Sequence, residues 1–285
     1  MSVTLSFQGH HGAYSEQACV HFFEDFIPLP CLTFEEALQA VHDNKADYAV
    51  IPIENSVAGR VADVHHLLPT SNLFILAEHF ERIEHCLLAL PTATFDDIEN
   101  VHSHVHALAQ CRNFIKNHHL SSVVHADTAG AACDVAKRQN IKDTAIASRL
   151  SAQKYNLKIL AENIEDTHNN TTRFLLMGKT QKIPSLKASQ AGDSYITSLI
   201  FQTRNVPAAL YKALGGFATN GINLLKIESY LFGGNFQDAH FYIDVAGHID
   251  EPGFQHALDE LSHFTKKHYI LGVYPKSKFR NEKTL

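Results

Sequence analysis

No apolar run in this sequence approaches the roughly 20 residues that a membrane-spanning helix needs. The first residues, Met1 to Thr4, also lack a charged stretch followed by an apolar one, which is the pattern of a secretory signal. The five cysteines are scattered and show no Cys-x-x-Cys spacing, which favours reduced thiols. These absences predict a cytoplasmic protein without a membrane segment.

Signatures of nucleic-acid binding and of coenzymes are missing as well. The net charge is -6 and no basic run is present, which argues against a nucleic-acid partner. Neither a Walker A motif nor the three glycines of a dinucleotide fingerprint occurs, so we expect no cofactor.

Histidine, by contrast, is abundant, with 20 residues. His102, His104 and His106 would face one way if they lay on a strand, and this is the only spacing that suggests a metal site. Solvated or helix-capping histidines are the simpler interpretation, and we expect no metal.

Strand-like and helical patterns alternate over residues 1–178, which indicates an α/β domain rich in parallel strands. We expect two lobes with a cleft between them, like those of periplasmic binding proteins. The polar segment 179–192 has the composition of a linker, and 193–278 follows the order β-α-β-β-α-β of a ferredoxin-like domain, with a tail at 279–285. Small domains of this kind commonly pair, so we expect a homodimer or a homotetramer.

Polar segments occur where predicted strands end. The glycine-flanked turn 9–15 leads into a helix whose predicted N-cap is Ser15, and it is either an anion site or a plain tight turn. Glu54, Asn55 and Ser56 follow a later strand, in the place where open α/β sheets bind ligands. The alternative is that they only cap the next helix.

Two further segments are of the same kind. Ser103 and His104 are neighbours, but adjacency does not make a nucleophile and base pair, and we expect Ser103 to cap the following helix. Residues 169–174 set two amides, two hydroxyls and a guanidinium ahead of an apolar strand, where they could hold a carboxylate and a hydroxyl. The alternative is an Asn-rich turn with Arg173 in solvent.

In their order and spacing these segments resemble the prephenate dehydratase family followed by an ACT regulatory domain, over nearly the whole chain. The matching motifs are the turn 9–15, Pro52 to Ser56 with Gly59, Ser103-His104 with Ala107, Leu108 and Gln110, and Asn170-x-Thr172-Arg173-Phe174.

The resemblance implies a cofactor-free reaction that converts prephenate to phenylpyruvate for phenylalanine biosynthesis, with loss of carbon dioxide and water. Arogenate dehydratase shares the same motifs, and a non-catalytic amino-acid-binding regulator is an alternative from another class, which would bind a ligand tightly and form no product. Because the first strand follows Met1 directly, we expect no fused chorismate mutase.

The resemblance also implies roles for single residues. Thr172 would protonate the departing hydroxyl, directly or through a relay, and Arg173 would hold a carboxylate or polarise Thr172. His104 is the rival proton donor. The implied catalytic residues are Thr172, Arg173, Ser103 and Asn55, and the implied substrate-binding residues are Ser15, Glu54, Ser56, His104, Gln110, Asn170 and Phe174.

The chain departs from the family pattern at several positions. His10 and Ala13 replace a proline and a threonine in the first turn, and His106 stands where glutamine is common. In the ACT part, Ala208 replaces a glycine and Tyr230-Leu231 replaces Arg-Pro. Phenylalanine is the expected effector, bound between paired ACT units near Ala209, Leu210, Asn220, Asn223, Leu224 and Glu228.

Overall fold

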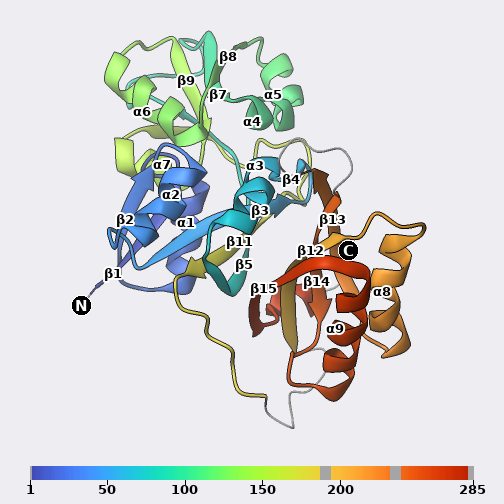
Figure 1. Ribbon diagram of the computed structural model, residues 1–285. Helices are drawn as coiled ribbons and strands as arrows, with labels where there is room; N and C mark the ends of the chain where they lie inside the picture. Colours follow the sequence, from blue (N-terminus) through green and yellow to red (C-terminus); the bar gives the residue numbers. More distant parts are fainter. Residues whose placement is uncertain (1, 187–193, 232–238, 282–285) are drawn as a thin grey trace. The chain divides into compact units, whose positions relative to one another are not determined.

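A computed structural model describes residues 2–186, 194–231 and 239–281 (Figure 1). The chain forms two compact units: unit 1 contains Met1–Val61 and His79–Phe174, and unit 2 contains Ala62–Glu78 and Leu175–Leu285. The predicted division into a domain at 1–178, a linker and a domain at 193–278 stays a prediction. Residues 187–192 of that linker and 282–285 of the predicted tail lie outside the described residues.

The first sheet of unit 1 holds the N-terminal strands. Its order is β2-β1-β3-β11-β5, with a short strand β4 paired to β3, and β1 runs parallel to both β2 and β3. The elements are β1 (Val3–Gln8), α1 (Tyr14–Phe22), β2 (Phe26–Cys31), α2 (Phe34–His42), β3 (Tyr48–Asn55), β4 (Gly59–Arg60), β5 (Phe74–Arg82) and β11 (Thr171–Gly178). Residues 79–82 of β5 and 171–174 of β11 belong to unit 1. Thr33 caps α2 by accepting a hydrogen bond from the Glu36 amide.

The second sheet of unit 1 has the order β10-β6-β9-β7-β8. Strand β7 is parallel to β8 and β9, whereas β6 is antiparallel to β9 and β10. The elements are β6 (Cys86–Ala89), β7 (Asn100–His104), α4 (Val105–Gln110), α5 (Arg112–Asn117), β8 (Ser121–His125), α6 (Thr128–Arg138), β9 (Asp143–Ala147), α7 (Arg149–Tyr155) and β10 (Lys158–Ala161). Small and aliphatic residues from strands and helices form one buried core here, which explains the apolar runs of the sequence.

The chain passes between these two sheets at two places, from β5 to β6 and from β10 to β11. The two crossing segments lie side by side, because the Ile83 amide donates a 2.8 Å hydrogen bond to the Asn170 carbonyl. Polar residues that the sequence placed at the start of β11 therefore lie where the two lobes of unit 1 join.

Unit 2 contains a four-stranded antiparallel sheet of order β13-β14-β12-β15. Two helices pack on it around a phenylalanine-rich core of Phe201, Phe217, Phe241 and Phe254. The elements are β12 (Tyr195–Thr203), α8 (Ala209–Thr219), β13 (Leu224–Leu231), β14 (Ala239–Ala246), α9 (Pro252–Phe264) and β15 (Thr265–Pro275), together with α3 (Ala62–Leu67) and the 3-10 turns η1 (Leu68–Thr70) and η3 (Lys278–Asn281). The element order is the β-α-β-β-α-β that the sequence predicted.

Helix α8 begins at Ala209, two residues after Pro207. Its N-cap, Ala208, has φ +58° in the left-handed region, where a glycine carries no penalty.

An ion pair holds the C-terminal end of the described chain in place. Arg280 donates through Nε and Nη2 to the two carboxylate oxygens of Glu78, at 2.8 and 2.9 Å. Nearby in the same unit, the buried Asp244 accepts hydrogen bonds from Ser198 at 2.5 Å and from Tyr242 at 2.6 Å. Buried carboxylates with this many donors hold β12, β14 and η3 in one arrangement.

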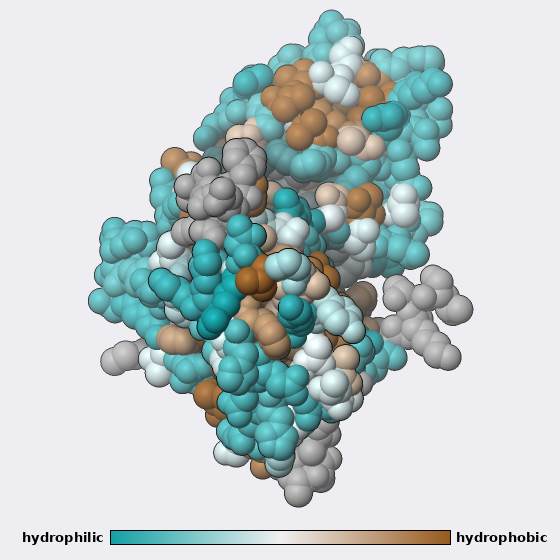
Figure 2. All heavy atoms as spheres, turned by 45° about the vertical axis from the view of Figure 1, so that its right-hand side comes forward, coloured by the Kyte–Doolittle hydropathy of each residue, from teal (hydrophilic) through white to brown (hydrophobic). Residues whose placement is uncertain are grey.

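On the face that Figure 2 shows, most of the surface is hydrophilic and hydrophobic residues gather in separate groups. Within the described ranges, no helix has both the length and the apolar character to cross a bilayer. All five cysteines are free thiols.

Candidate active site

Asn55 and Thr172 form the centre of a polar cluster, which lies where β3 ends and β11 begins. The Asn55 side-chain amide donates to Thr172 Oγ1 at 2.9 Å and to Asn170 Oδ1 at 2.6 Å. The Asn55 Oδ1 atom accepts hydrogen bonds from the backbone amides of Val57 and Ala58, at 2.9 and 2.7 Å. Every polar atom of this side chain is therefore used, and its orientation is fixed. Because Thr172 Oγ1 accepts from the amide, its own proton remains to be donated elsewhere.

Ser56 joins the two strands next to that cluster. Its hydroxyl donates to the Asn169 carbonyl at 2.6 Å and accepts from the Thr171 amide at 2.9 Å. Its backbone amide donates to the Thr171 carbonyl at 2.8 Å. These bonds bring the predicted segments 54–56 and 169–174 together, although more than 100 residues separate them in sequence.

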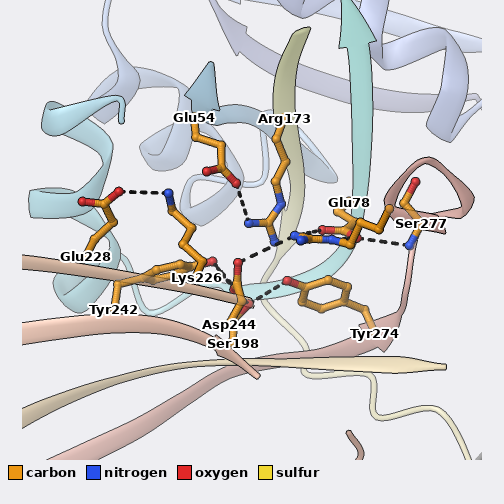
Figure 3. A network of polar contacts seen from close by, with 11 residues as sticks. Glu54, Glu78, Arg173, Ser198, Lys226, Glu228, Tyr242, Asp244, Tyr274 and Ser277 are labelled. Atoms are coloured by element: carbon orange, nitrogen blue, oxygen red, sulfur yellow. Dashed lines mark hydrogen bonds and ion pairs between the residues drawn. The ribbon is translucent and has the colours of Figure 1, made fainter. Parts of the chain in front are cut away.

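Arg173 is buried and paired with Glu54. Its Nη1 lies 3.0 Å from Glu54 Oε1, and its side chain is 0% exposed against 28% for Glu54 (Figure 3). The alternative in which Arg173 lies in solvent is therefore wrong. A guanidinium without water requires a carboxylate or several acceptors, so this pair also fixes β11 against β3.

A chain of hydrogen bonds leads from the cluster to two residues that the sequence analysis did not select. Asn170 Nδ2 donates to Gln110 Oε1 at 2.9 Å, and His85 Nε2 lies 2.9 Å from that same oxygen. His85 Nδ1 lies 2.8 Å and the Glu84 carbonyl oxygen 2.9 Å from the Tyr14 hydroxyl, whose single proton is shared between these two acceptors. Since Gln110 Oε1 only accepts, His85 Nε2 carries a proton.

Burial sets the protonation of this pair. It lowers the pKa of His85, and the hydrogen bond with Gln110 opposes the shift. It also raises the pKa of Tyr14 well above its usual value. Both side chains are therefore neutral near pH 7, with Tyr14 as a donor. Tyr14 belongs to the first sequence motif, whereas no local pattern marks His85.

A pocket of about 310 Å³ adjoins the cluster in unit 1. It is lined by Val57, Ala58, His106, Ala109, Gln110, Glu165, Asp166, Thr167 and Asn170. Gln110 and Asn170 are thus the predicted site residues that line it directly. The lining includes two carboxylates and no lysine or arginine. Glu165 is the more buried acid: its Oε2 accepts from the His85 amide, and its buried Oε1 has no hydrogen-bond partner among the residues that the structure describes.

In the turn 9–15, a side chain of the protein takes the position expected for a bound anion. Helix α1 has Ala13 as N-cap, so the prediction that Ser15 caps it is wrong, and Ser15 is buried within the first turn. The Gly12 amide donates to Glu16 Oε2 at 2.6 Å, so the protein's own carboxylate occupies the expected anion position. A Cβ on Gly12, where φ is +88°, would lie 2.6 Å from Ser151 Oγ, which explains the glycine.

Among the described hydrogen bonds and ion pairs, those of Ser103 and His104 are with residues other than Thr172. The Ser103 hydroxyl donates to the Ile146 carbonyl at 2.6 Å, inside the second sheet. The helix cap is instead His104, whose ring accepts from the His106 amide at 3.3 Å, so the predicted Ser103 cap is wrong. Burial and the neighbouring His106 lower the pKa of His104, which leaves it neutral near pH 7. Phe174 is buried in β11.

The three alternating histidines do not share one face. His102 and His104 lie on β7, whereas His106 lies in α4. His102 is buried with its Nδ1 3.0 Å from His125 Nε2. The premise of a metal site on this triplet is therefore wrong.

The residues predicted to bind an effector lie at both ends of α8 and on β13. Ala209 and Leu210 are in the first turn of α8. Asn220 ends that helix and donates to the Gly216 carbonyl at 2.8 Å. The Asn223 carbonyl accepts from the Ala246 amide at 2.9 Å, and Leu224 opens β13. Glu228 pairs with Lys226 at 3.0 Å (Figure 3).

Comparison with known proteins identifies relatives over the whole chain. The family model described as prephenate dehydratase matches residues 5–182. A bifunctional N-acyl-homoserine lactone acylase/prephenate dehydratase of Komagataeibacter europaeus is 45% identical, over 98% of each chain. An arogenate dehydratase/prephenate dehydratase of Arabidopsis thaliana is 40% identical over 96% of this chain and 72% of its own. The crystal structure of an Arthrobacter aurescens prephenate dehydratase in complex with L-Phe superposes with a TM-score of 0.87 at 31% identity, over 96% of this chain and 90% of that one.

Proposed function

Because the chain belongs to the prephenate dehydratase family, we propose that it converts prephenate to phenylpyruvate in phenylalanine biosynthesis. In this reaction the ring carboxylate leaves as carbon dioxide, and its bonding electrons aromatise the ring as the ring hydroxyl leaves. The hydroxyl departs as water once it has received a proton. Aromatisation supplies the driving force, so the protein needs only to orient a dianion and donate a proton.

The observation that carries this proposal is the Asn55 to Thr172 hydrogen bond. An unassisted threonine hydroxyl is a very weak acid. The Asn55 amide donates to Thr172 Oγ1 and so stabilises the anion that forms when the proton leaves. The neighbouring Arg173 is paired with Glu54 and so holds in place the strand that carries Thr172.

The chain from Asn170 to Tyr14 acts by orientation. Side-chain amides neither gain nor lose protons near neutral pH, so Asn170 and Gln110 hold positions and do not resupply the proton. Neutral His85, a donor at Nε2, fixes the Gln110 oxygen, and Gln110 in turn fixes Asn170. Tyr14 and His85 are therefore positioning residues.

His104 fits the donor role less well. Its lowered pKa makes the imidazolium scarce at neutral pH, and its ring caps α4. Ser103 uses its hydroxyl inside the second sheet, which favours a structural role over the catalytic one implied by the resemblance.

Arogenate is the second candidate substrate, and the acidic pocket favours it. Arogenate carries an ammonium group where prephenate has a keto group, and Glu165 and Asp166 line the pocket without a basic neighbour among its lining residues. Amide hydrolysis is a third candidate, suggested only by the name of the Komagataeibacter relative.

One experiment separates these activities. The purified chain is incubated in parallel with prephenate, arogenate and an N-acyl-homoserine lactone, and phenylpyruvate, phenylalanine and homoserine lactone are quantified. A kcat/KM for prephenate that exceeds the value for arogenate supports the proposal. A larger kcat/KM for arogenate would instead make arogenate the substrate. Ligand binding without any product supports a regulator.

Unit 2 supplies the proposed regulation. We assign its β-α-β-β-α-β part to the ACT class and L-phenylalanine as effector, on the strength of the element order and of the L-Phe complex of the Arthrobacter relative. Feedback requires that phenylalanine bind two states of the enzyme with different affinity. ACT units would pair in a homodimer or homotetramer to form the effector site.

A further inference from the structure

A histidine pair and one glutamate converge at the C-terminal end of α1, outside the cluster around Thr172. His21 lies in the last turn of α1, and His79 and Glu81 lie on β5. His79 and Glu81 are two residues apart on a strand, so their side chains share a face. One ligand atom from each of the three lies within 4.8 Å of the others.

The atoms meet at one carboxylate oxygen. Glu81 Oε2 lies 2.9 Å from His79 Nε2 and 3.1 Å from His21 Nε2. The two rings are stacked, with centroids 3.8 Å apart and planes 17° apart, so their in-plane lone pairs run nearly parallel and one ring would have to turn for both to bind a single ion. Phe22 packs edge-on to His79 at 6.0 Å and restrains that ring.

These separations are close to what a tetrahedral ion requires. Bonds of about 2.1 Å to zinc at a tetrahedral angle place ligand atoms roughly 3.4 Å apart. The glutamate oxygen needs to withdraw from each histidine by only a few tenths of an ångström. A bound ion would replace the protons that the histidines otherwise share with the carboxylate.

Gln17 supports the carboxylate from behind. Its Nε2 donates to Glu81 Oε1 at 2.7 Å, which orients the glutamate and leaves Oε2 for an ion. The Glu81 side chain is 8% exposed, and its ion pairs among the described residues are with these two histidines. A divalent cation would give this buried carboxylate a permanent positive partner.

We propose that His21, His79 and Glu81 bind a divalent ion of the zinc class. Two imidazoles and one carboxylate are a zinc ligand set, whereas magnesium and calcium prefer oxygen ligands alone. The His21 side chain is 51% exposed, so water reaches this side of the site and completes the coordination. The ion would tie the end of α1 to β5.

This site is independent of the proposed reaction, since it uses no residue of the Thr172 cluster. Its structural consequence follows from α1. The same helix begins at Tyr14, which already contacts His85, so an ion at His21 would restrain the other end of α1.

The test uses the full chain after dialysis against a chelator. Co²⁺ is added stepwise, and the visible d-d absorption of a tetrahedral ion is recorded, followed by competition with Zn²⁺. We expect one equivalent of Co²⁺ with a strong band that Zn²⁺ abolishes. His79→Ala and His21→Ala should each weaken binding by at least about 100-fold, and Gln17→Ala by about 10-fold.

A matched control is needed because the chain has 20 histidines. His263→Ala removes an exposed histidine at the end of α9, and it should bind Co²⁺ like the unmodified chain. Far-ultraviolet circular dichroism establishes that each variant is folded, and Glu81→Gln tests the site without removing an imidazole. The proposal is overturned if the folded chain gives no stoichiometric band, or if His79→Ala and Glu81→Gln bind as the His263→Ala control does.

Discussion

Arg173 Nη1 lies 3.0 Å from Glu54 Oε1, and the two residues come from neighbouring strands at the joint between the two sheets of unit 1. The Arg173 side chain has no exposed surface, so its charge depends on protein partners. The same strand carries Thr172 as the preceding residue, whose side chain points to the opposite face. The pair therefore fixes the strand, and the strand fixes the hydroxyl.

The first prediction concerns this pair. Arg173→Ala leaves the Glu54 carboxylate without its guanidinium and empties a buried volume, and it should lower the free energy of unfolding by about 3–5 kcal/mol. Glu54 is partly exposed, so Glu54→Gln should cost less, about 1–2 kcal/mol. Urea unfolding followed by circular dichroism measures both, and equal stability of all three proteins would contradict the structural role.

The second prediction concerns Thr172. Thr172→Ala removes the proposed proton donor, and kcat with prephenate should fall by on the order of 10²–10⁴. Thr172→Ser keeps a hydroxyl beside the Asn55 amide and should retain most of the activity. Steady-state rates of phenylpyruvate formation decide the matter. If the alanine variant turns over as fast as the serine variant, another group donates the proton.

A third prediction follows from the buried His85. Its pKa is lowered in the folded chain, so the unfolded chain binds more protons as the pH falls below about 6.5. The stability that neutral His85 contributes is thus present above pH 6.5 and is lost as the pH falls towards the folded pKa. Urea midpoints measured between pH 5 and pH 8 should show this loss, with a shallower slope in His85→Asn. An unchanged slope in the variant would assign the effect to other groups, such as His104 and His125, whose pKa values are also lowered by burial.

The fourth prediction uses the left-handed Ala208. An alanine at φ +58° costs about 1–2 kcal/mol, and glycine relieves this at an entropic cost of about 0.4–1 kcal/mol in the unfolded chain. Ala208→Gly should therefore stabilise unit 2 by about 0.5–1 kcal/mol. Ala209→Gly is the matched control, because Ala209 lies within α8, where glycine should destabilise by about the same amount. Thermal unfolding of the two variants should shift in opposite directions.

The fifth prediction concerns the effector. L-phenylalanine at 100 times its dissociation constant should stabilise the protein by about 2.7 kcal/mol and inhibit phenylpyruvate formation. Glu228→Gln, which removes a carboxylate from the set of predicted effector-binding residues, should weaken both effects. Thermal unfolding and activity are measured over the same titration, with D-phenylalanine as a control. If the L isomer changes neither quantity, the proposed effector is wrong.

Local patterns predicted much of the architecture because helix and strand periodicity depend on near neighbours. The alternation of elements in unit 1 and the β-α-β-β-α-β order in unit 2 follow from such patterns. Helix starts were less predictable. Ser15 and Ser103 are good caps by residue type, yet Glu16 reaches back to the Gly12 amide and the Ser103 hydroxyl bonds to Ile146, a residue on another strand.

The sequence by itself determined which polar groups lie at the ends of the strands. Asn55 and Ser56 lie at the end of β3, and Asn170 to Arg173 lie at the start of β11. Only the tertiary structure decided that these groups meet each other, that His85 and Tyr14 support them, and that His21 faces His79 and Glu81. Each of these contacts joins residues far apart in the chain, and their side chains meet only after sheets and helices have packed. Sequence patterns report the local preference of the backbone, whereas the chemistry of this site depends on distances that packing alone sets.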